Sequence, residues 1–444
     1  MLRNIYIVGI INQIAKIAVG PCLLISIPHY LSIESQGYWY FFLGAVGFFM
    51  LAELGVLTIC GSFSAHESNK LKSIISKENS NPEHLKNASI ILDFSLRWIK
   101  SKGSAYIITA SLFGGCLLTA RSVDEHWLTP WIIITVSAYI NLRNTTLLAF
   151  MEGIGLIAKS QSTKCAGTIV YLITTLALLI SGLGINSLAL GYLAGSITTS
   201  LIIKKQFGEI ILKLKSIEIK NKERYSLSQL GEMTKRSAIC SIGGCLSFQS
   251  ISIMAFLFYD QATAGRIGLT LGLFSVIYAL SLTFLNITLP KIGSLFSEGK
   301  ISEARKLSIT ATAASLSTYV LLSTALLAVL GYSKLPYIHL LASRLEEKQI
   351  IYIAAACWIP QLIINGIAGY VRSQRKEPFA SASLFSGIYV AFFSAFIAAN
   401  FDERYFLIGL FSSYAFTLPW FVINLIKEEK NQLKTADYKN IHTS

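Results

Sequence analysis

The chain has 444 residues, of which 53% are hydrophobic and only 14% are charged, and its mean hydropathy is +0.56. Soluble globular domains carry about 25% charged residues, so this composition excludes an ordinary soluble protein and indicates an integral membrane protein. The formal net charge is +14. Basic loops that face anionic lipid headgroups explain this charge, so we expect no nucleic-acid partner.

Twelve hydrophobic stretches are long enough to cross a bilayer, since a spanning helix needs roughly 20 residues at ~1.5 Å per residue. The first contains Pro21 and Pro28 and lacks a small-residue cleavage site after a short apolar core. These features favour a retained span over a removed signal peptide. The stretches lie near residues 4–31, 37–63, 105–122, 127–150, 165–183, 185–207, 237–258, 265–289, 309–331, 350–371, 379–399 and 405–426.

The basic residues predict the orientation of these spans. About 30 of the 38 Lys and Arg residues fall on the side that holds both termini, when the connections are assigned alternately to two sides. By the positive-inside rule we expect both termini in the cytoplasm.

The two longest hydrophilic segments, 64–104 and 208–236, both lie on the predicted cytoplasmic side. Each contains an amphipathic stretch suited to the membrane interface, at 88–100 and 208–224. The second segment divides the spans six and six. We therefore predict an N-terminal six-helix lobe at 1–207, a linker at 208–236, a C-terminal six-helix lobe at 237–427 and a cytoplasmic tail at 428–444.

The two predicted lobes show weak similarity to each other. The second span opens with SQG at Ser35 and its cytoplasmic end begins GSFS at Gly61, while the eighth opens with TAG at Thr263 and ends GSLF at Gly293. An internal repeat of this kind is common in secondary transporters, whose binding sites lie between the repeats.

No motif supports enzymatic chemistry. The seven cysteines are scattered without a CxxC spacing, the six histidines are dispersed, and HExxH, GxxxxGK[ST] and GxSxG are absent from the sequence. We therefore expect no cofactor, no metal site and no enzymatic activity.

Three charged residues lie deep in predicted spans, namely Lys16, Glu53 and Arg143. A charge at a helix centre costs about 2.5–3.5 kcal/mol, so such groups face a cavity or a partner. Lys16 and Glu53 lie at similar predicted depth in antiparallel neighbours. They either neutralise each other as an ion pair or line a polar cavity, in which Glu53 organises the site or carries a coupling proton.

The residues around Lys16 favour the cavity. Asn12, Lys16 and Gly20 recur every four residues, with Gln13 beside them, and form a polar stripe on one helix face. Gly20 and Pro21 also make a candidate hinge near the middle of the first span, because a proline inside a helix frees a carbonyl group and permits a kink. The alternative is the ordinary tolerance of proline in membrane helices.

Other polar residues in the spans have two interpretations. Arg143 either lines the cavity or extends its long stem to the interface. In the seventh span a row of polar residues ends at Gln249, and in the eighth Asn286 shares a face with Tyr278. Small and hydroxyl residues at helical spacing are often packing contacts. The candidate substrate-binding set is Lys16, Arg143, Asn12, Gln13, Gln249 and Asn286.

Several segments resemble the Wzx-type O-antigen flippases, which share a superfamily with the MATE multidrug exporters and the lipid II flippase. The resemblance covers parts of five predicted spans, in the order and topology that the family implies. The matching segments are YLSIESQGYWYFF at Tyr30–Phe42, AELG at Ala52–Gly55, FSAHE at Phe63–Glu67, MEGIGLIAKSQ at Met151–Gln161, GINSLALGYLAG at Gly184–Gly195 and ATAGRIGLTL at Ala262–Leu271.

The resemblance implies an all-α, MATE-like exporter of the bacterial inner membrane, with two six-helix lobes around a central cavity. It also implies an undecaprenyl-pyrophosphate-linked oligosaccharide as substrate, with a polysaccharide polymerase and a chain-length regulator as further partners besides membrane lipid. A diphosphate needs cations, and Lys16 and Arg143 would supply them. The chain departs from the family in having few deep cations and no clearly marked coupling carboxylate.

Three other functions compete with this interpretation. A cation-coupled multidrug exporter of the same fold would favour deep carboxylates, whereas Glu53 stands alone among them here. A major-facilitator transporter would carry a GxxxDRxGRR-like turn after the second span, which is absent from the sequence. A polysaccharide polymerase or ligase would need a substantial outer loop with acid, base or Arg groups, and the longest predicted outer loop is only 332–349.

Overall fold

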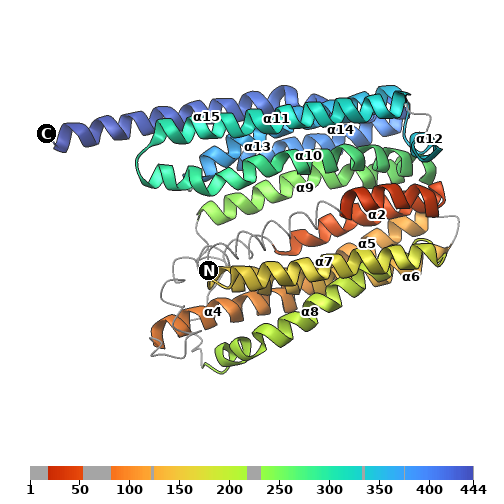
Figure 1. The fold of residues 1–444 in the computed structure, drawn as a ribbon, viewed down its shortest axis with the longest axis horizontal. Helices are drawn as coiled ribbons and strands as arrows, with labels where there is room; N and C mark the ends of the chain where they lie inside the picture. The colour runs from red at the N-terminus through yellow and green to blue at the C-terminus, as the bar shows by residue number, and fades with distance from the viewer. Residues whose placement is uncertain are drawn as a thin grey trace. The chain divides into compact units, whose positions relative to one another are not determined.

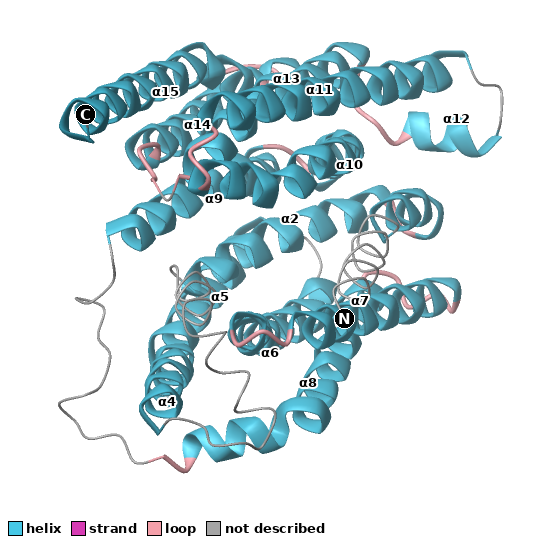
Figure 2. Ribbon diagram, turned by 60° about the vertical axis from the view of Figure 1, so that its left-hand side comes forward, coloured by secondary structure: helices cyan, strands magenta, loops and turns pink. Residues whose placement is uncertain are grey.

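The computed structural model describes residues 19–53, 82–121, 125–217, 232–332, 336–374 and 376–443. These residues form helices joined by short connections, and none of them lies in a β-strand (Figures 1 and 2). The chain divides into two compact units, Met1–Lys235 and Arg236–Ser444, which we call unit 1 and unit 2. The predicted all-α fold class is confirmed.

Unit 1 contains helices that are mostly long and apolar, with short 3-10 or π turns between some of them. In chain order they are Val19–Tyr30, α2 (Ile33–Met50), η1 (Leu51–Glu53), α4 (Pro82–Trp98), η2 (Ile99–Gly103), α5 (Ser104–Arg121), η3 (Glu125–Trp127), α6 (Leu128–Gly153), α7 (Ile157–Ile180) and α8 (Asn186–Lys215).

Unit 2 contains longer helices, several of which run side by side over most of their length (Figure 1). In chain order they are α9 (Glu232–Phe258), α10 (Gln261–Ser297), α11 (Ile301–Tyr332), α12 (Pro336–Ser343), α13 (Lys348–Arg372), α14 (Ala380–Asn400), η6 (Glu403–Tyr405) and α15 (Ile408–Thr443).

Nine helices in the described part of the chain are long and apolar enough to cross a membrane. Two further helices, α2 and α6, lie where the second and fourth spans are predicted. Because helices satisfy their own backbone hydrogen bonds, they are suited to a hydrocarbon environment. The chain is a multi-pass membrane protein.

Small residues bring α7 and α8 of unit 1 close together. A Cβ atom added to Gly191 would overlap the hydroxyl oxygen of Thr175, and one added to Gly167 would overlap the hydroxyl oxygen of Thr199. Membrane helices commonly associate through such small faces, which let their backbones approach. This contact fixes the polar faces of α7 and α8 relative to each other.

In unit 2, α9 and α14 cross at two glycines. A Cβ atom at Gly243 would overlap the backbone carbonyl of Ser383, and one at Gly387 would overlap the carbonyl of Gly243. The neighbouring Gly244 differs, since a Cβ atom there has no other atom within 4 Å. Only the first of these two adjacent glycines is therefore required for helix packing.

The segment before α5 packs on the ends of two other helices of unit 1. Apolar residues of α4, including Ile91 and Phe94, form a buried cluster with Phe150 of α6 and Phe207 of α8. The hydroxyl of Ser89 also donates to the carbonyl of Leu214 at 2.6 Å. The predicted amphipathic stretch at 88–100 thus lies largely in α4, and the first eight residues of the stretch at 208–224 lie in the end of α8. Residues 218–224 of the second stretch lie outside the described residues.

A charged cluster ties together one end of unit 2. Arg266 of α10 lies 3.4 Å from the Glu346 carboxylate and 4.0 Å from that of Glu403. The hydroxyl of Thr263 donates to Glu403 at 3.0 Å. Burial raises the pKa of Glu346, and the nearby Arg266 offsets only part of this effect. The cluster joins the start of α10 to the connections before α13 and α15.

Candidate functional site

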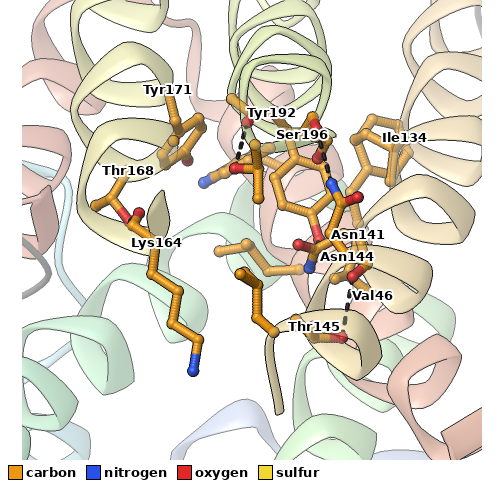
Figure 3. A pocket seen from close by; sticks show the side chains of 17 residues that line it. Val46, Ile134, Asn141, Asn144, Thr145, Lys164, Thr168, Tyr171, Tyr192 and Ser196 are labelled. Atoms are coloured by element: carbon orange, nitrogen blue, oxygen red, sulfur yellow. Dashed lines mark hydrogen bonds between the residues drawn. The ribbon is translucent and has the colours of Figure 1, made fainter. Parts of the chain in front are cut away.

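A pocket of about 470 Å³ lies within unit 1, between α2, α6, α7 and α8. This volume is in the range of small-molecule sites. Figure 3 shows Lys164, Thr168 and Tyr171 across the pocket from Asn141, Asn144 and Thr145. The described residues that line it are Trp39, Phe42, Leu43, Val46, Ile134, Asn141, Asn144, Thr145, Leu148, Lys164, Gly167, Thr168, Tyr171, Tyr192, Gly195, Ser196 and Thr199.

One face of α6 supplies the amides of the pocket. Asn144 and Thr145 lie three and four residues after Asn141, and Leu148 lies three residues after Thr145, which places them on a single helix face. The Asn141 amide nitrogen donates to the Tyr192 hydroxyl at 3.0 Å. This bond leaves the Tyr192 proton available to a ligand, since a phenol can donate and accept at once.

Asn144 has a more structural position in the same wall. Its side chain is buried, and its amide nitrogen donates to the backbone carbonyl of Ser196 at 2.8 Å. Its amide oxygen accepts from the Ser200 hydroxyl at 2.8 Å. Asn144 therefore joins α6 to α8, and its hydrogen-bonding groups are used within the protein.

Lys164 is the only charged side chain among the described residues of the pocket wall. Its ammonium group lies 2.6 Å from Oε1 of Glu152, and this pair is about three-quarters buried. The same oxygen also accepts from Ser160 at 3.0 Å and from Gln161 at 2.8 Å. Three donors thus hold Glu152, and the carboxylate in turn positions Lys164 at the edge of the pocket.

Aromatic rings form the rest of the wall. Trp39 and Phe42 of α2 contribute apolar surface, and Tyr171 meets Tyr192 edge to face with ring centroids 6.2 Å apart. A pocket that combines flat apolar faces with a few amides and hydroxyls binds ligands having both hydroxyl groups and apolar ring faces. No carboxylate is part of this wall among the described residues, so its aromatic faces are what it offers to a cation.

Several residues predicted for the site lie outside the described residues, namely Asn12, Gln13 and Lys16. The two hinge candidates are described. Gly20 and Pro21 are half-buried in the helical segment Val19–Tyr30, which is continuous through both of its prolines.

Arg143 and Glu53 are described, and neither lines the unit 1 pocket. Arg143 is exposed, because two residues along a helix turn it by ~200° from Asn141. Glu53 is half-buried in η1, where α2 ends in a 3-10 turn. The carbonyl of the preceding Ala52 accepts a hydrogen bond from the Trp98 indole at 2.9 Å. Their predicted roles stay predictions.

The remaining two candidates belong to unit 2. Gln249 is half-buried on α9 and Asn286 is exposed on α10. Neither lines the unit 1 pocket, and Tyr278, which was expected to share a face with Asn286, accepts a hydrogen bond from Asn365 instead. Their predicted roles in substrate binding also stay predictions.

The sequence-based set omitted the residues that form the pocket. Asn141 and Thr145 each lie two residues from Arg143 in the predicted span 127–150, and Lys164 lies just before the predicted span 165–183. Tyr171 and Tyr192 carried no distinct signal, because tyrosine is common in membrane helices. The available signal was the face shared by Asn141, Asn144 and Thr145, which a helical wheel separates from Arg143.

In sequence, the chain matches no family model and no curated protein. In structure, it is similar to an inward-facing multidrug resistance MATE family transporter of the MOP superfamily, at 13% identity over 94% of this chain and 99% of that chain, with a TM-score of 0.61. It is similar to a MATE in the straight conformation at 12% identity over 96% of each chain, with a TM-score of 0.58.

The chain has the MATE fold. The predicted MATE-like fold class is thereby confirmed. A MOP superfamily transporter from Pyrococcus furiosus, whose structure is described as having a binding pocket of reverse polarity that suggests a different function, also has this fold. It is 10% identical over 95% of this chain and 94% of that chain, with a TM-score of 0.53.

Proposed function

We propose that this chain is a membrane exporter that moves an undecaprenyl-pyrophosphate-linked oligosaccharide across a bacterial inner membrane by alternating access. The fold supports export in general, since structures of multidrug transporters share it along nearly the whole chain. The substrate class rests on the resemblance to O-antigen flippases and on the chemistry of the unit 1 pocket.

The observation that carries the substrate proposal is the composition of the pocket wall. Amides and hydroxyls from Asn141, Thr168 and Tyr192 can exchange hydrogen bonds with sugar hydroxyls, and the aromatic rings offer surfaces for sugar rings. Lys164 suits an acidic sugar or a phosphate. The pocket volume of about 470 Å³ accommodates part of an oligosaccharide, so the rest of the glycan and the prenyl chain would lie outside it.

The second candidate function is cation-coupled multidrug export. Its support is that several of the similar structures are those of MATE transporters, one of which is a multidrug resistance transporter. A cationic drug needs a carboxylate or an open aromatic face. Glu152, the carboxylate beside the described pocket, is held by Lys164, so the pocket offers a cation only aromatic faces such as those of Trp39 and Tyr171. The transporter with reverse pocket polarity supports the idea that this fold serves substrates of different charge.

Three sequence candidates keep a place in this proposal. Lys16 and Arg143 would contact the pyrophosphate, and Glu53 would carry a coupling proton at the end of α2. The orientation with both termini in the cytoplasm, and the partnership with a polysaccharide polymerase and a chain-length regulator, belong to the same proposal.

Deleting the gene from the bacterium that encodes it is expected to remove the surface polysaccharide and to trap lipid-linked repeat units in the inner membrane. Surface polysaccharide would be quantified by gel analysis of cell-envelope extracts, and susceptibility to cationic drugs would be measured on the same cells. We expect the first to change and the second to stay at the wild-type level. Normal polysaccharide together with raised drug susceptibility would overturn the proposal in favour of multidrug export.

A further inference from the structure

Unit 2 contains a polar pocket of its own, of about 420 Å³. It lies between α9, α13, α14 and α15, at the end of the unit where the connection 373–379 joins α13 to α14. Hydroxyls, amides and one ion pair line it, in contrast to the apolar helix faces around it. Its described polar lining residues are Ser237, Cys240, Ser241, Gln361, Asn365, Arg372, Glu377 and Ser383.

The ion pair has an asymmetric burial. Glu377 bonds through Oε2 to Nε of Arg372, and the Glu377 side chain is 1% exposed whereas that of Arg372 is 44% exposed. The buried Glu377 carboxylate therefore positions the guanidinium group of Arg372, and the guanidinium group is the solvent-accessible part of the pair. No other ion pair to Arg372 occurs in the residues that the structure describes.

The geometry of the pair is incomplete. An arginine and a carboxylate that serve only each other usually form two parallel hydrogen bonds. Here Oε1 of Glu377 is buried without a hydrogen-bond partner among the described residues. The pair is made through Nε, and the Cys240 thiol lies beside both members and interacts with each of them. The terminal NH₂ groups form the forked end of the Arg372 guanidinium, and such a fork fits the oxygens of a phosphate.

Two further features of the pocket favour an anion. The α14 helix begins at Ala380 beside the ion pair, its N-cap residue makes no side-chain capping hydrogen bond, and its positive dipole end favours negative charge. The side chains of Ser383, Asn365 and Gln361 add donors to the same wall. Among the described residues, Glu377 is the only carboxylate of the pocket, and Arg372 already neutralises it.

We propose that the unit 2 pocket binds a phosphate group through Arg372, with Glu377 as the positioning residue. The phosphate would come either from the pyrophosphate of the transported lipid, which rests on the function proposed above, or from the headgroup of an anionic phospholipid. Both sources present the same oxygens to the guanidinium.

The direct test is calorimetric titration of the purified full chain, in phosphatidylcholine nanodiscs, with inorganic pyrophosphate. We expect binding by the wild type. Arg372→Gln should weaken it by about tenfold or more, since a charge-assisted hydrogen bond is lost. Arg372→Lys should also weaken it, because a lysine keeps the charge and lacks the fork. Arg305→Gln is the matched control, since Arg305 is paired with Glu429, is 61% exposed and lies outside the pocket.

A second variant fills the pocket without touching the ion pair. Gly244 lines the pocket, and a Cβ atom there has no other atom within 4 Å. Gly244→Leu should therefore keep the thermal unfolding temperature of the wild type and abolish pyrophosphate binding. Glu377→Gln should weaken binding severalfold, and its unfolding temperature would show whether the fold is retained. Absence of binding by the wild type, or unchanged affinity in both Arg372→Gln and Gly244→Leu, would overturn the proposal.

Competition identifies the source of the phosphate. If an anionic lipid occupies the pocket, adding phosphatidylglycerol to the nanodiscs lowers the apparent affinity of the wild type for pyrophosphate. The affinity of the control variant Arg305→Gln then falls by the same factor. If the transported lipid occupies it, undecaprenyl pyrophosphate competes and phosphatidylglycerol does not. The titration uses no oligosaccharide, so absence of pyrophosphate binding would not contradict the proposed export function. Equally, evidence against oligosaccharide export would not contradict a measured phosphate site.

Discussion

Asn141→Leu is expected to reduce export of the lipid-linked oligosaccharide by about tenfold or more while the protein remains folded in the membrane. The substitution removes the amide that bonds to Tyr192 at 3.0 Å and presents an apolar side chain to the sugar. A sugar hydroxyl that is buried against the leucine without a hydrogen-bond partner costs about 1–3 kcal/mol, which corresponds to this loss of affinity. Export would be measured as surface polysaccharide per cell, at equal amounts of membrane-inserted protein.

Thr145→Val is the matched control for this substitution. Thr145 lines the same pocket from the same helix, and its hydroxyl already donates to the carbonyls of Asn141 and Leu142 at 2.9 and 3.0 Å. Valine keeps the shape of threonine, so export should stay near the wild-type level. Equal export by Asn141→Leu and Thr145→Val would contradict a role of the pocket in substrate binding.

Lys164→Gln is expected to lower export by at least about tenfold when the substrate carries an acidic sugar or presents its phosphate to the pocket. The ammonium group is the only charge in the described wall, and a charge-assisted hydrogen bond in a partly buried site contributes about 1.5–3 kcal/mol. Export and thermal stability would be measured together, because Glu152 loses a partner in this variant.

The double variant Lys164→Gln, Glu152→Gln separates two roles of Lys164. If Lys164 only neutralises Glu152, removing both charges restores stability and export. If Lys164 contacts the substrate, stability returns and export stays low. We expect the second result, and a return of export to the wild-type level would show that the ion pair is purely structural. Glu152→Gln alone leaves the ammonium group in place and is expected to retain most of the export.

The membrane-spanning helices could be predicted from the sequence because a helix that crosses the hydrocarbon core needs about 20 mostly apolar residues. The predicted span 127–150 corresponds to α6 at Leu128–Gly153, and the span 379–399 to α14 at Ala380–Asn400. The ends of the helices were less predictable. Hydrophobicity marks where lipid begins and ends, whereas a helix continues into the polar region wherever its backbone can, as α8 does to Lys215.

This difference explains why Lys164 falls just outside a predicted span although it lies within a helix. The span was predicted at 165–183, but α7 begins at Ile157, so Lys164 lies two turns inside the helix. Thr168 lies four residues after Lys164, and Tyr171 lies three residues after Thr168, so the three residues share one face of α7. A prediction based on hydropathy alone cannot separate the start of a helix from the start of its buried part.

The partners of the polar groups could not be predicted at all. Asn144 bonds to Ser200, and Asn365 bonds to Tyr278, which are 56 and 87 residues apart in sequence. These pairs depend on how helices pack, and in unit 1 that packing follows from the fit of Gly191 against Thr175. Arg143 is a sequence candidate because of its predicted depth in the membrane. Depth alone does not show which neighbouring helix a side chain contacts.

The most direct measurement of the proposed function is the movement of a lipid-linked oligosaccharide across proteoliposomes that contain only this purified chain. Undecaprenyl-pyrophosphate-linked oligosaccharide would be placed in the inner leaflet, and its appearance outside would be detected with a sugar-binding lectin that does not cross the membrane. We predict that the wild type exposes the oligosaccharide and that Asn141→Leu does so much more slowly. Transport of a cationic dye with no movement of the oligosaccharide would contradict the proposal.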